Sequence, residues 1–254
     1  MLNDKEVVSA FVSYLREHGY PALKIDRIPD EENRKSSDID AIAGFFAIEH
    51  TSVDTIANQR RDADWFLHAA GGIEEAVAHQ LQYRLDISIP YEAVQYGQNW
   101  ADIQKSFITW IVTCTPDLGQ GVHTIANVQG IPFEFIAKKD TKHKPKLFLA
   151  RIAPLDNSLS GRIREQFFRK SQKLLPYKEQ GYITVLLSES NDIALMDEAK
   201  MLDAIRIGLS RRLPKGVDRL WYVATGIPED LLFFEFTEAL QKIVTEHSNG
   251  RSCL

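Results

Sequence analysis

Residues 38–53, DIDAIAGFFAIEHTSV, give the strongest indication of the fold. The segment Asp38-Ile39-Asp40-Ala41-Ile42-Ala43 begins with alternating polar and apolar residues, Gly44 interrupts it, and a largely apolar, strand-like run continues from Phe45 to Val53. Alternation with a period of two is typical of a strand, and a glycine between two such runs favours a tight turn. The stretch therefore predicts a β-hairpin.

The hairpin carries four polar side chains that we expect on one face: Asp38, Asp40, Glu49 and Thr51. A turn of two or four residues centred on residues 43 and 44 sets Asp38 directly across from Glu49, with Cβ atoms roughly 5 Å apart. A three-residue turn would instead send the acids of the two strands to opposite faces. Alternating acids are most often a solvated strand face. The sharper interpretation is that Asp38, Asp40 and Glu49 bind Mg²⁺ (or Mn²⁺), which uses one or two carboxylates together with waters and phosphate oxygens.

Outward from the hairpin, helices alternate with strands, which predicts an α/β fold with a mixed central sheet and helices on both faces. We interpret the chain as one elaborated domain with a core over about 4–65, an insertion over about 70–155 and an α/β portion over about 156–254. Helices are predicted over 4–18, 58–68, 73–85, 100–114, 158–175, 197–213 and 229–247. Strands are predicted over 87–94, 122–128, 131–137, 146–152, 182–187 and 220–224, with a lysine-rich loop over 138–146 and a turn over 188–192.

Composition excludes several classes of protein. The 254 residues are 44% hydrophobic and 26% charged, with a net charge of −5, which is typical of a globular protein. No apolar run approaches the roughly 20 residues of a membrane-spanning helix, and the first residues do not resemble a signal peptide. Cys114 and Cys253 do not form a disulfide framework. We therefore expect a cytoplasmic protein without a membrane partner, and the sequence leaves open whether it forms a homodimer.

Motifs for several chemistries are absent from the sequence. It contains no phosphate-binding G-x-x-x-x-G-K-[ST] loop, no G-x-G-x-x-G, no G-x-S-x-G, no H-E-x-x-H and no C-x-x-C. These absences argue against a P-loop enzyme, a dinucleotide-binding domain, a serine hydrolase of the α/β type and a zinc site. Carboxylate chemistry is what remains.

An ordered set of motifs runs through the first third of the chain. Glu6 lies on the predicted first helix, Gly19-Tyr20 ends it, Ser37-Asp38-Ile39-Asp40-Ala41-Ile42 forms the first strand, and Ala47-Ile48-Glu49-His50-Thr51 forms the second. This order resembles the core of the PD-(D/E)XK nuclease superfamily, including Mrr-type restriction endonucleases, over about residues 4–65. The resemblance implies a restriction-endonuclease-like fold with insertions and a metal-dependent phosphodiesterase activity.

The resemblance also assigns roles to individual residues. It maps the motif aspartate onto Asp40 or Asp38, the strand acid onto Glu49 and the helix glutamate onto Glu6. The chain departs from the pattern at Thr51, which stands where the family has a lysine. That lysine is expected to orient the attacking water and to offset developing negative charge, whereas threonine supplies only a hydrogen bond.

A lysine from elsewhere could replace the missing one, and the predicted helix over 158–175 offers candidates. Lys173 lies four residues after Arg169 and three after Lys170, so we expect one cationic ridge. Together with Arg162 these residues are predicted to bind phosphates, although a helix face in solvent has the same pattern. The lysine-rich loop is most often mobile surface, or else an arm that contacts a nucleic-acid backbone.

Three hypotheses follow. The first is a Mg²⁺-dependent nuclease acting on DNA, in which Asp40 and Glu49 hold the metal, Asp38 and Glu6 assist, and Thr51 or Lys173 positions the water. The second is a catalytically silent relative that binds nucleic acid or a protein partner. The third is a protein-interaction scaffold whose acids are merely surface residues.

Overall fold

The computed structural model describes residues 2–32 and 38–241, and the chain divides into two compact units. Unit 1 combines Met1–Ala57 with Asn157–Leu254, and unit 2 is the intervening Asn58–Asp156. The sequence interpretation treats residues 70–155 as an insertion into one elaborated domain. In the structure the inserted segment begins earlier, at Asn58, and has a hydrophobic core of its own.

Unit 1 is built on a six-stranded mixed sheet of order β1-β2-β3-β8-β9-β10. The strands β3, β8 and β9 are parallel to one another, whereas β1, β2 and β10 pair antiparallel at the two sides. The central strand β8 is buried along nearly its whole length, as its apolar sequence predicts. The strands are β1 (Ile25–Arg27), β2 (Ala41–Ala43), β3 (Phe46–Ser52), β8 (Ile183–Ser190), β9 (Arg219–Ala224) and β10 (Leu232–Glu235).

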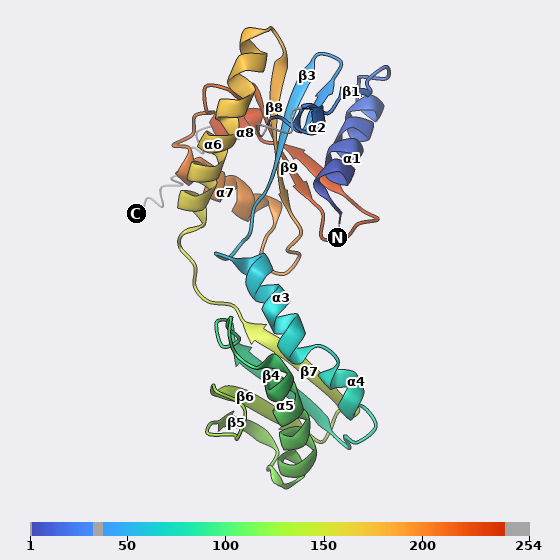
Figure 1. The fold of residues 1–254 in the computed structure, drawn as a ribbon, viewed down its shortest axis with the longest axis vertical. Helices are drawn as coiled ribbons and strands as arrows, with labels where there is room; N and C mark the ends of the chain where they lie inside the picture. The colour runs from blue at the N-terminus through green and yellow to red at the C-terminus, as the bar shows by residue number, and fades with distance from the viewer. Residues whose placement is uncertain (1, 33–37, 242–254) are drawn as a thin grey trace, which may run out of the picture. The chain divides into compact units, whose positions relative to one another are not determined.

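Helices cover both faces of this sheet, as predicted. Figure 1 shows α1 (Asp4–Glu17) on one side and α6 (Leu159–Glu179) with α7 (Glu198–Gly208) on the other. The side chains of α1 pack with alternate residues of β3, β8 and β9 in one apolar cluster, and those of α6 and α7 pack with the intervening residues in a second cluster. Two short helices, α2 (Pro29–Glu32) and α8 (Thr237–Gln241), complete unit 1.

Unit 2 contains a four-stranded mixed sheet of order β5-β6-β4-β7, in which β4 and β7 are parallel and the other pairs antiparallel. The strands are β4 (Arg84–Pro90), β5 (Gly121–Ile125), β6 (Phe135–Asp140) and β7 (Lys146–Ile152). The helices are α3 (Gln59–Ala70), α4 (Ile73–Val77), α5 (Trp100–Cys114) and a 3₁₀ turn over Thr115–Asp117. The α5 helix begins at the predicted cap, Asn99, whose side chain accepts a hydrogen bond from the Asp102 amide.

Several predicted elements are wrong in type or extent. The helix predicted over 73–85 ends at Val77, and residues 84–90 form β4, because Leu85, Ile87 and Ile89 alternate into the core. Residues 138–140 of the predicted lysine-rich loop belong to β6. The helix predicted over 229–247 contains β10 and the short α8 instead, and its last residues lie outside the described chain.

None of the described helices has the length and apolar composition needed to span a membrane.

Candidate functional site

The β2–β3 hairpin places the predicted acids, with a register that differs from the expected one. Ala43 pairs with Phe46, so the turn consists of Gly44 and Phe45 and lies one residue later than predicted. Gly44 takes a positive φ of 53°, which a two-residue hairpin turn favours. Continuing this register sets Asp40, not Asp38, across from Glu49. The predicted opposition of Asp38 and Glu49 is therefore wrong.

Asp40 lies where β2 begins, and its carboxylate is turned to the backbone of β3. Its amide donates to the Ile48 carbonyl at 3.1 Å, and its Oδ2 accepts a hydrogen bond from the His50 amide at 2.6 Å. The Asp40 carboxylate thus accepts the hydrogen bond of a β3 amide at a position just before β2 begins. The carboxylate is held beside Glu49 by this bond.

Glu49 is the centre of the candidate site. Its side chain is fully buried on the face of the sheet that α6 covers. Its Oε1 lies 2.5 Å from Lys170 Nζ and 3.1 Å from Lys173 Nζ, both of which extend from α6. Its Oε2 is also buried but accepts no hydrogen bond from any described residue. One carboxylate oxygen is therefore paired twice and the other is left without a donor.

The surroundings of Glu49 raise its pKa above the ordinary value for a glutamate side chain. Burial, followed by the nearby Asp40 carboxylate, raises the pKa of Glu49 to about 7. The ammonium groups of Lys170 and Lys173 oppose that rise. Because the pKa lies near neutral pH, a further cation would strongly favour ionised Glu49.

Asp38 is engaged elsewhere and lies to the side of Glu49. Its Oδ1 accepts hydrogen bonds from the Ile39 amide at 2.8 Å and from the Tyr177 hydroxyl at 2.9 Å. Lys173 Nζ donates to the Asp38 backbone carbonyl at 2.7 Å as well as reaching Glu49. Burial and the Asp38 carboxylate raise the pKa of Tyr177 to about 12, so this hydroxyl stays protonated at neutral pH.

Thr51 and Arg162 serve structural contacts around the site. Thr51 is buried and its Oγ1 accepts a hydrogen bond from Gln166 Nε2, which also donates to the Ser52 carbonyl at 2.8 Å. Arg162 donates to the carbonyls of Asp54 and Thr55 at 2.9 and 3.0 Å. These bonds tie the start of α6 to the segment that follows β3.

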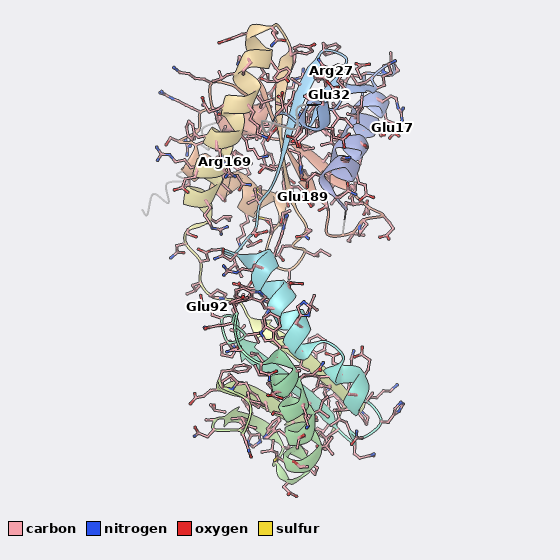
Figure 2. All side chains as sticks on the ribbon, viewed as in Figure 1. Glu17, Arg27, Glu32, Glu92, Arg169 and Glu189 are labelled. Atoms are coloured by element: carbon pink, nitrogen blue, oxygen red, sulfur yellow. The ribbon has the colours of Figure 1, made fainter. Side chains whose placement is uncertain are left out.

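Two predicted site residues lie apart from Glu49. Glu6 forms a capping box with Asn3 at the start of α1: the Glu6 amide donates to Asn3 Oδ1 at 3.0 Å, and the Asn3 amide donates to Glu6 Oε2 at 2.8 Å. Arg169, labelled in Figure 2, is exposed on α6, whereas Lys170 and Lys173 point at the sheet. The predicted cationic ridge is thus split between solvent and the site.

The sequence interpretation missed Gln166 and Tyr177 and did not pair Lys170 with Glu49. A signal was available in α6. Arg162, Gln166, Lys170, Lys173 and Tyr177 are spaced by four, four, three and four residues, which places them along one face of a helix. A polar stripe on a helix that must also cover a buried strand indicates polar partners on that strand.

A second polar cluster lies on the opposite face of the sheet, where alternation along β3 sends His50. His50 Nε2 lies 3.4 Å from Glu189 Oε2, and its Nδ1 lies 3.6 Å from Asp4 Oδ1. Ser52 Oγ and Thr225 Oγ1 donate to Glu189 at 2.6 and 2.5 Å. Glu189, labelled in Figure 2, belongs to β8, although the sequence predicts a turn there.

The Glu189 carboxylate is well satisfied. Burial alone would raise the pKa of Glu189, but the nearby His50 ring and the hydrogen bonds from Ser52 and Thr225 outweigh it and hold the pKa at about 2. Glu189 is therefore ionised throughout the neutral range.

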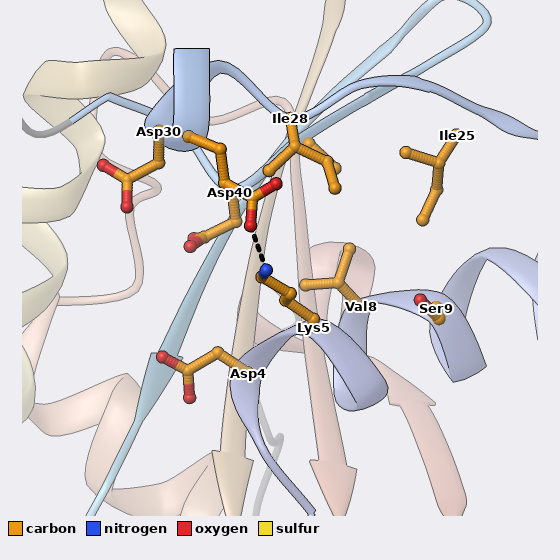
Figure 3. A pocket seen from close by; sticks show the side chains of 10 residues that line it. Asp4, Lys5, Val8, Ser9, Ile25, Ile28, Asp30 and Asp40 are labelled. Atoms are coloured by element: carbon orange, nitrogen blue, oxygen red, sulfur yellow. Dashed lines mark ion pairs between the residues drawn. The ribbon is translucent and has the colours of Figure 1, made fainter. Parts of the chain in front are cut away.

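A pocket of about 160 Å³ opens on the α1 side of the sheet. Figure 3 shows the acids Asp4, Asp30 and Asp40 around Lys5, which pairs with the unlabelled Glu31 of α2. Val8, Ile25 and Ile28 supply an apolar wall. Asp40 thus adjoins both this pocket and the surroundings of Glu49.

Within the described residues, no group of three or more His, Cys, Asp or Glu side chains could hold a metal ion. The predicted trio Asp38, Asp40 and Glu49 is accordingly not assembled as one ligand set. Comparison of the chain with protein-family models, with curated proteins and with solved structures gave no match. The arrangement of Asp40, Glu49, Lys170 and Lys173 is the feature of the chain that bears most directly on function.

Proposed function

We propose that the protein is a divalent-metal-dependent phosphodiesterase that acts on DNA, with Asp40 and Glu49 as metal ligands on a restriction-endonuclease-like core. The observation that carries this proposal is the state of Glu49. A fully buried carboxylate has one oxygen that receives no hydrogen bond from residues 2–32 or 38–241, and it lies beside Asp40 and within reach of two lysines. We infer that the protein acts in the cytoplasm.

The residues present fit Mg²⁺ or Mn²⁺ in number and type. Mg²⁺ commonly takes one or two protein carboxylates and completes its coordination with waters and phosphate oxygens, so a third protein acid is not required. Glu49 Oε2 and the Asp40 carboxylate would supply those two ligands. A metal ion bound there would polarise the phosphate and stabilise the charge that develops during attack by water.

Lys170 and Lys173 provide the positive charge that Thr51 does not. Both ammonium groups lie at Glu49, although they extend from a helix more than 110 residues further along the chain. In the proposed reaction one ammonium group orients the attacking water, and the other offsets charge on the phosphate oxygens. The Asp38 carbonyl accepts a hydrogen bond from Lys173 and holds it in place from the side, and the Tyr177 hydroxyl donates to the Asp38 carboxylate.

The second candidate function is a silent relative that binds nucleic acid or a protein partner. The same lysines favour it, because they already compensate Glu49 without a metal ion. Metal binding separates the two candidates: an enzyme of the proposed kind binds Mn²⁺ at Glu49, and a silent relative does not.

Calorimetric titration with Mn²⁺ is the first test, carried out on the wild type, on Glu49→Gln and on Glu17→Gln. Glu17 is an exposed acid on α1 and serves as the matched control. We expect the wild type and Glu17→Gln to bind Mn²⁺ equally, and Glu49→Gln to bind at least tenfold more weakly. A wild type that takes up no Mn²⁺ at millimolar concentration would overturn the proposal.

Cleavage of plasmid and single-stranded DNA with Mg²⁺ or Mn²⁺ is the second test. Glu49→Gln should lower the rate by about 10³-fold, as loss of a metal ligand or a transition-state donor does. Lys170→Gln should lower it by about 10²-fold, and Arg164→Gln, an exposed cation of the same helix, should leave it unchanged. Equal rates for wild type and Glu49→Gln would show that the cleavage does not arise at this site.

A further inference from the structure

The sheet of unit 2 has one covered face and one exposed face. Along its strands, alternate residues such as Leu85, Ile87, Phe135, Ala137 and Leu147 are buried against α4 and α5. The intervening residues form the other side of the sheet and are exposed or half-buried. We call this side the open face; it comprises Arg84, Asp86, Ser88, Val122, Thr124, Ile136, Lys138, Asp140, Lys146, Phe148, Ala150 and Ile152.

Large apolar side chains are exposed on the open face. Val122 is 66% exposed, Phe148 48%, Ile152 46% and Ile136 37%. Scattered exposed apolar residues are common on protein surfaces, but these four share one side of one sheet. They form two groups: Val122 and Ile136 on the adjacent strands β5 and β6, and Phe148 and Ile152 on β7, with β4 between the groups. Phe148 presents an aromatic ring on β7, and the ammonium group of Lys146 lies 5.7 Å from its centroid.

Charged residues lie between and beside these apolar side chains. In strand order, Val122, Lys138, Asp86 and Phe148 form one row across the sheet, and Asp140, Arg84 and Lys146 form the next. The loop that joins β6 to β7 adds Lys142 and Lys144 beside these rows.

The two acids of the open face are engaged within unit 2. Asp86 Oδ1 accepts from Arg84 Nε at 2.8 Å, and Asp140 binds the His143 ring at 2.8 Å and the Lys142 amide at 2.8 Å. Arg84 and four lysines on this side of the sheet and its loop outnumber these two acids, so the charge presented to a partner is positive, although the whole chain is acidic. This charge complements a polyanion.

Lys138 and Lys139, adjacent on β6, differ in whether their ammonium groups can contact a partner. Lys139 points into unit 2, is buried, and donates to the carbonyls of Thr115, Pro116 and Leu118 at 2.8 to 2.9 Å. Lys138 points the other way and is exposed. Lys139 thus anchors the sheet to the end of α5, whereas Lys138 faces solvent.

We propose that the open face binds single-stranded nucleic acid. A base stacks on Phe148, the exposed aliphatic side chains contact neighbouring bases, and Lys138, Lys146 and the loop lysines contact phosphates. An aromatic ring beside cations on an uncovered sheet suits unpaired bases, whose faces are accessible, better than a duplex, whose bases are stacked on one another. The inference concerns unit 2 alone and does not depend on the proposed activity of Glu49.

Fluorescence anisotropy of the full chain with a labelled 20-nucleotide oligo(dT), in EDTA and about 50 mM salt, tests the proposal. The wild type should bind, and the double variant Lys138→Glu/Lys146→Glu should bind at least tenfold more weakly. Lys105→Glu, an exposed cation on α5, is the matched control and should bind like the wild type. Because EDTA removes divalent metal, a failure of the Glu49 proposal leaves this measurement unaffected.

Phe148→Ala tests stacking separately from charge. It should weaken binding about tenfold while leaving the dependence of affinity on salt unchanged, whereas the double lysine variant, which removes two phosphate contacts, should reduce the salt slope by about 1.4. A labelled 20-base-pair duplex should bind more weakly than oligo(dT).

Several results would overturn the proposal. These are no binding of oligo(dT) at 50 µM protein, equal loss of affinity in Lys105→Glu and in the double variant, or stronger binding of the duplex. Binding of phosphatidylserine vesicles without binding of oligo(dT) would assign the open face to an anionic membrane surface instead. Circular dichroism of each variant identifies any loss of affinity that arises from unfolding.

Discussion

Glu49 and Glu189 are two buried acids on neighbouring strands of one sheet, and their pKa values shift in opposite directions. The pKa of Glu49 is raised to about 7 and that of Glu189 is lowered to about 2. Burial raises both. The difference comes from their surroundings: Glu189 receives hydrogen bonds on both oxygens, whereas Glu49 has an oxygen without a donor and a carboxylate, Asp40, nearby.

A bound cation can gain more free energy at Glu49 than at Glu189. An acid with all its donors in place is already as stable in its ionised form as its surroundings allow, and it fixes structure. An acid that is incompletely satisfied gains from a further cation. Glu49 of β3, the candidate binding residue, lies on one face of the sheet. The next residue, His50, lies on the other face in the cluster around Glu189.

The largest expected effect breaks the compensation at Glu49. The double variant Lys170→Met/Lys173→Met should lower the free energy of unfolding at pH 8 by about 4 kcal/mol, because it leaves a buried charge unpaired. Adding Glu49→Gln should recover most of the loss, since the triple variant carries no charge there. Urea denaturation measures both. A double variant as stable as the wild type would mean that the lysines do not compensate Glu49.

The second effect concerns Glu189 and acid. Its folded pKa of about 2 lies below the ordinary value near 4.5, so its contribution is complete above that value and is lost as pH falls toward 2. The shift corresponds to about 3 kcal/mol. We expect the free energy of unfolding of the wild type to exceed that of Glu189→Gln at pH 6 and the two to converge near pH 2.5.

Glu179→Gln, an exposed acid at the end of α6, is the control for that measurement. A constant difference between wild type and Glu189→Gln from pH 6 to pH 2.5 would contradict the assignment of a lowered pKa.

The smallest effect that we expect is a dependence of Mn²⁺ affinity on the protonation of Glu49. With a pKa of about 7, Glu49 is about one-tenth ionised at pH 6 and nine-tenths ionised at pH 8. Because Mn²⁺ must displace the proton, its affinity should rise about tenfold over this range. Titration calorimetry at the two pH values measures the change. An affinity that does not vary with pH would place the metal elsewhere.

Much of unit 1 could be predicted from the sequence, because its elements have strong local signals. The alternation in residues 38–53 indicates the hairpin, and the apolar run at 182–187 indicates a buried strand. The sequence places the turn at residues 43 and 44, whereas it lies at residues 44 and 45. Alternation indicates which face a side chain takes but not which residues stand opposite each other. Glu49 and Thr51 both face α6, but Ile39 and Ile42 lie in the same core cluster, so the alternation is broken before β2 and Asp40 lines a pocket beside α1.

The candidate site was harder to predict than the fold. Glu49 stands out in the sequence, but its pairing with Lys170 depends on how α6 lies on β3, which no local pattern records. Glu6 was assigned to the site from motif order, and in the structure it caps its own helix. In unit 2, the sequence predicts a helix up to residue 85 and a strand over 87–94, whereas β4 spans Arg84–Pro90, because a short apolar run fits either period and leaves the boundary open.

The division of the chain into units has a consequence for its synthesis. Unit 1 pairs β3 with β8, and the roughly one hundred residues of unit 2 are translated between them. At about 5–20 residues per second, the N-terminal segment waits on the order of 5 to 20 seconds at the ribosome for its partner strand. All the core residues of unit 2 come from its own continuous segment, so it can fold during that interval. Glu49 and its lysines meet only afterwards, which makes the candidate site one of the last parts of the protein to form.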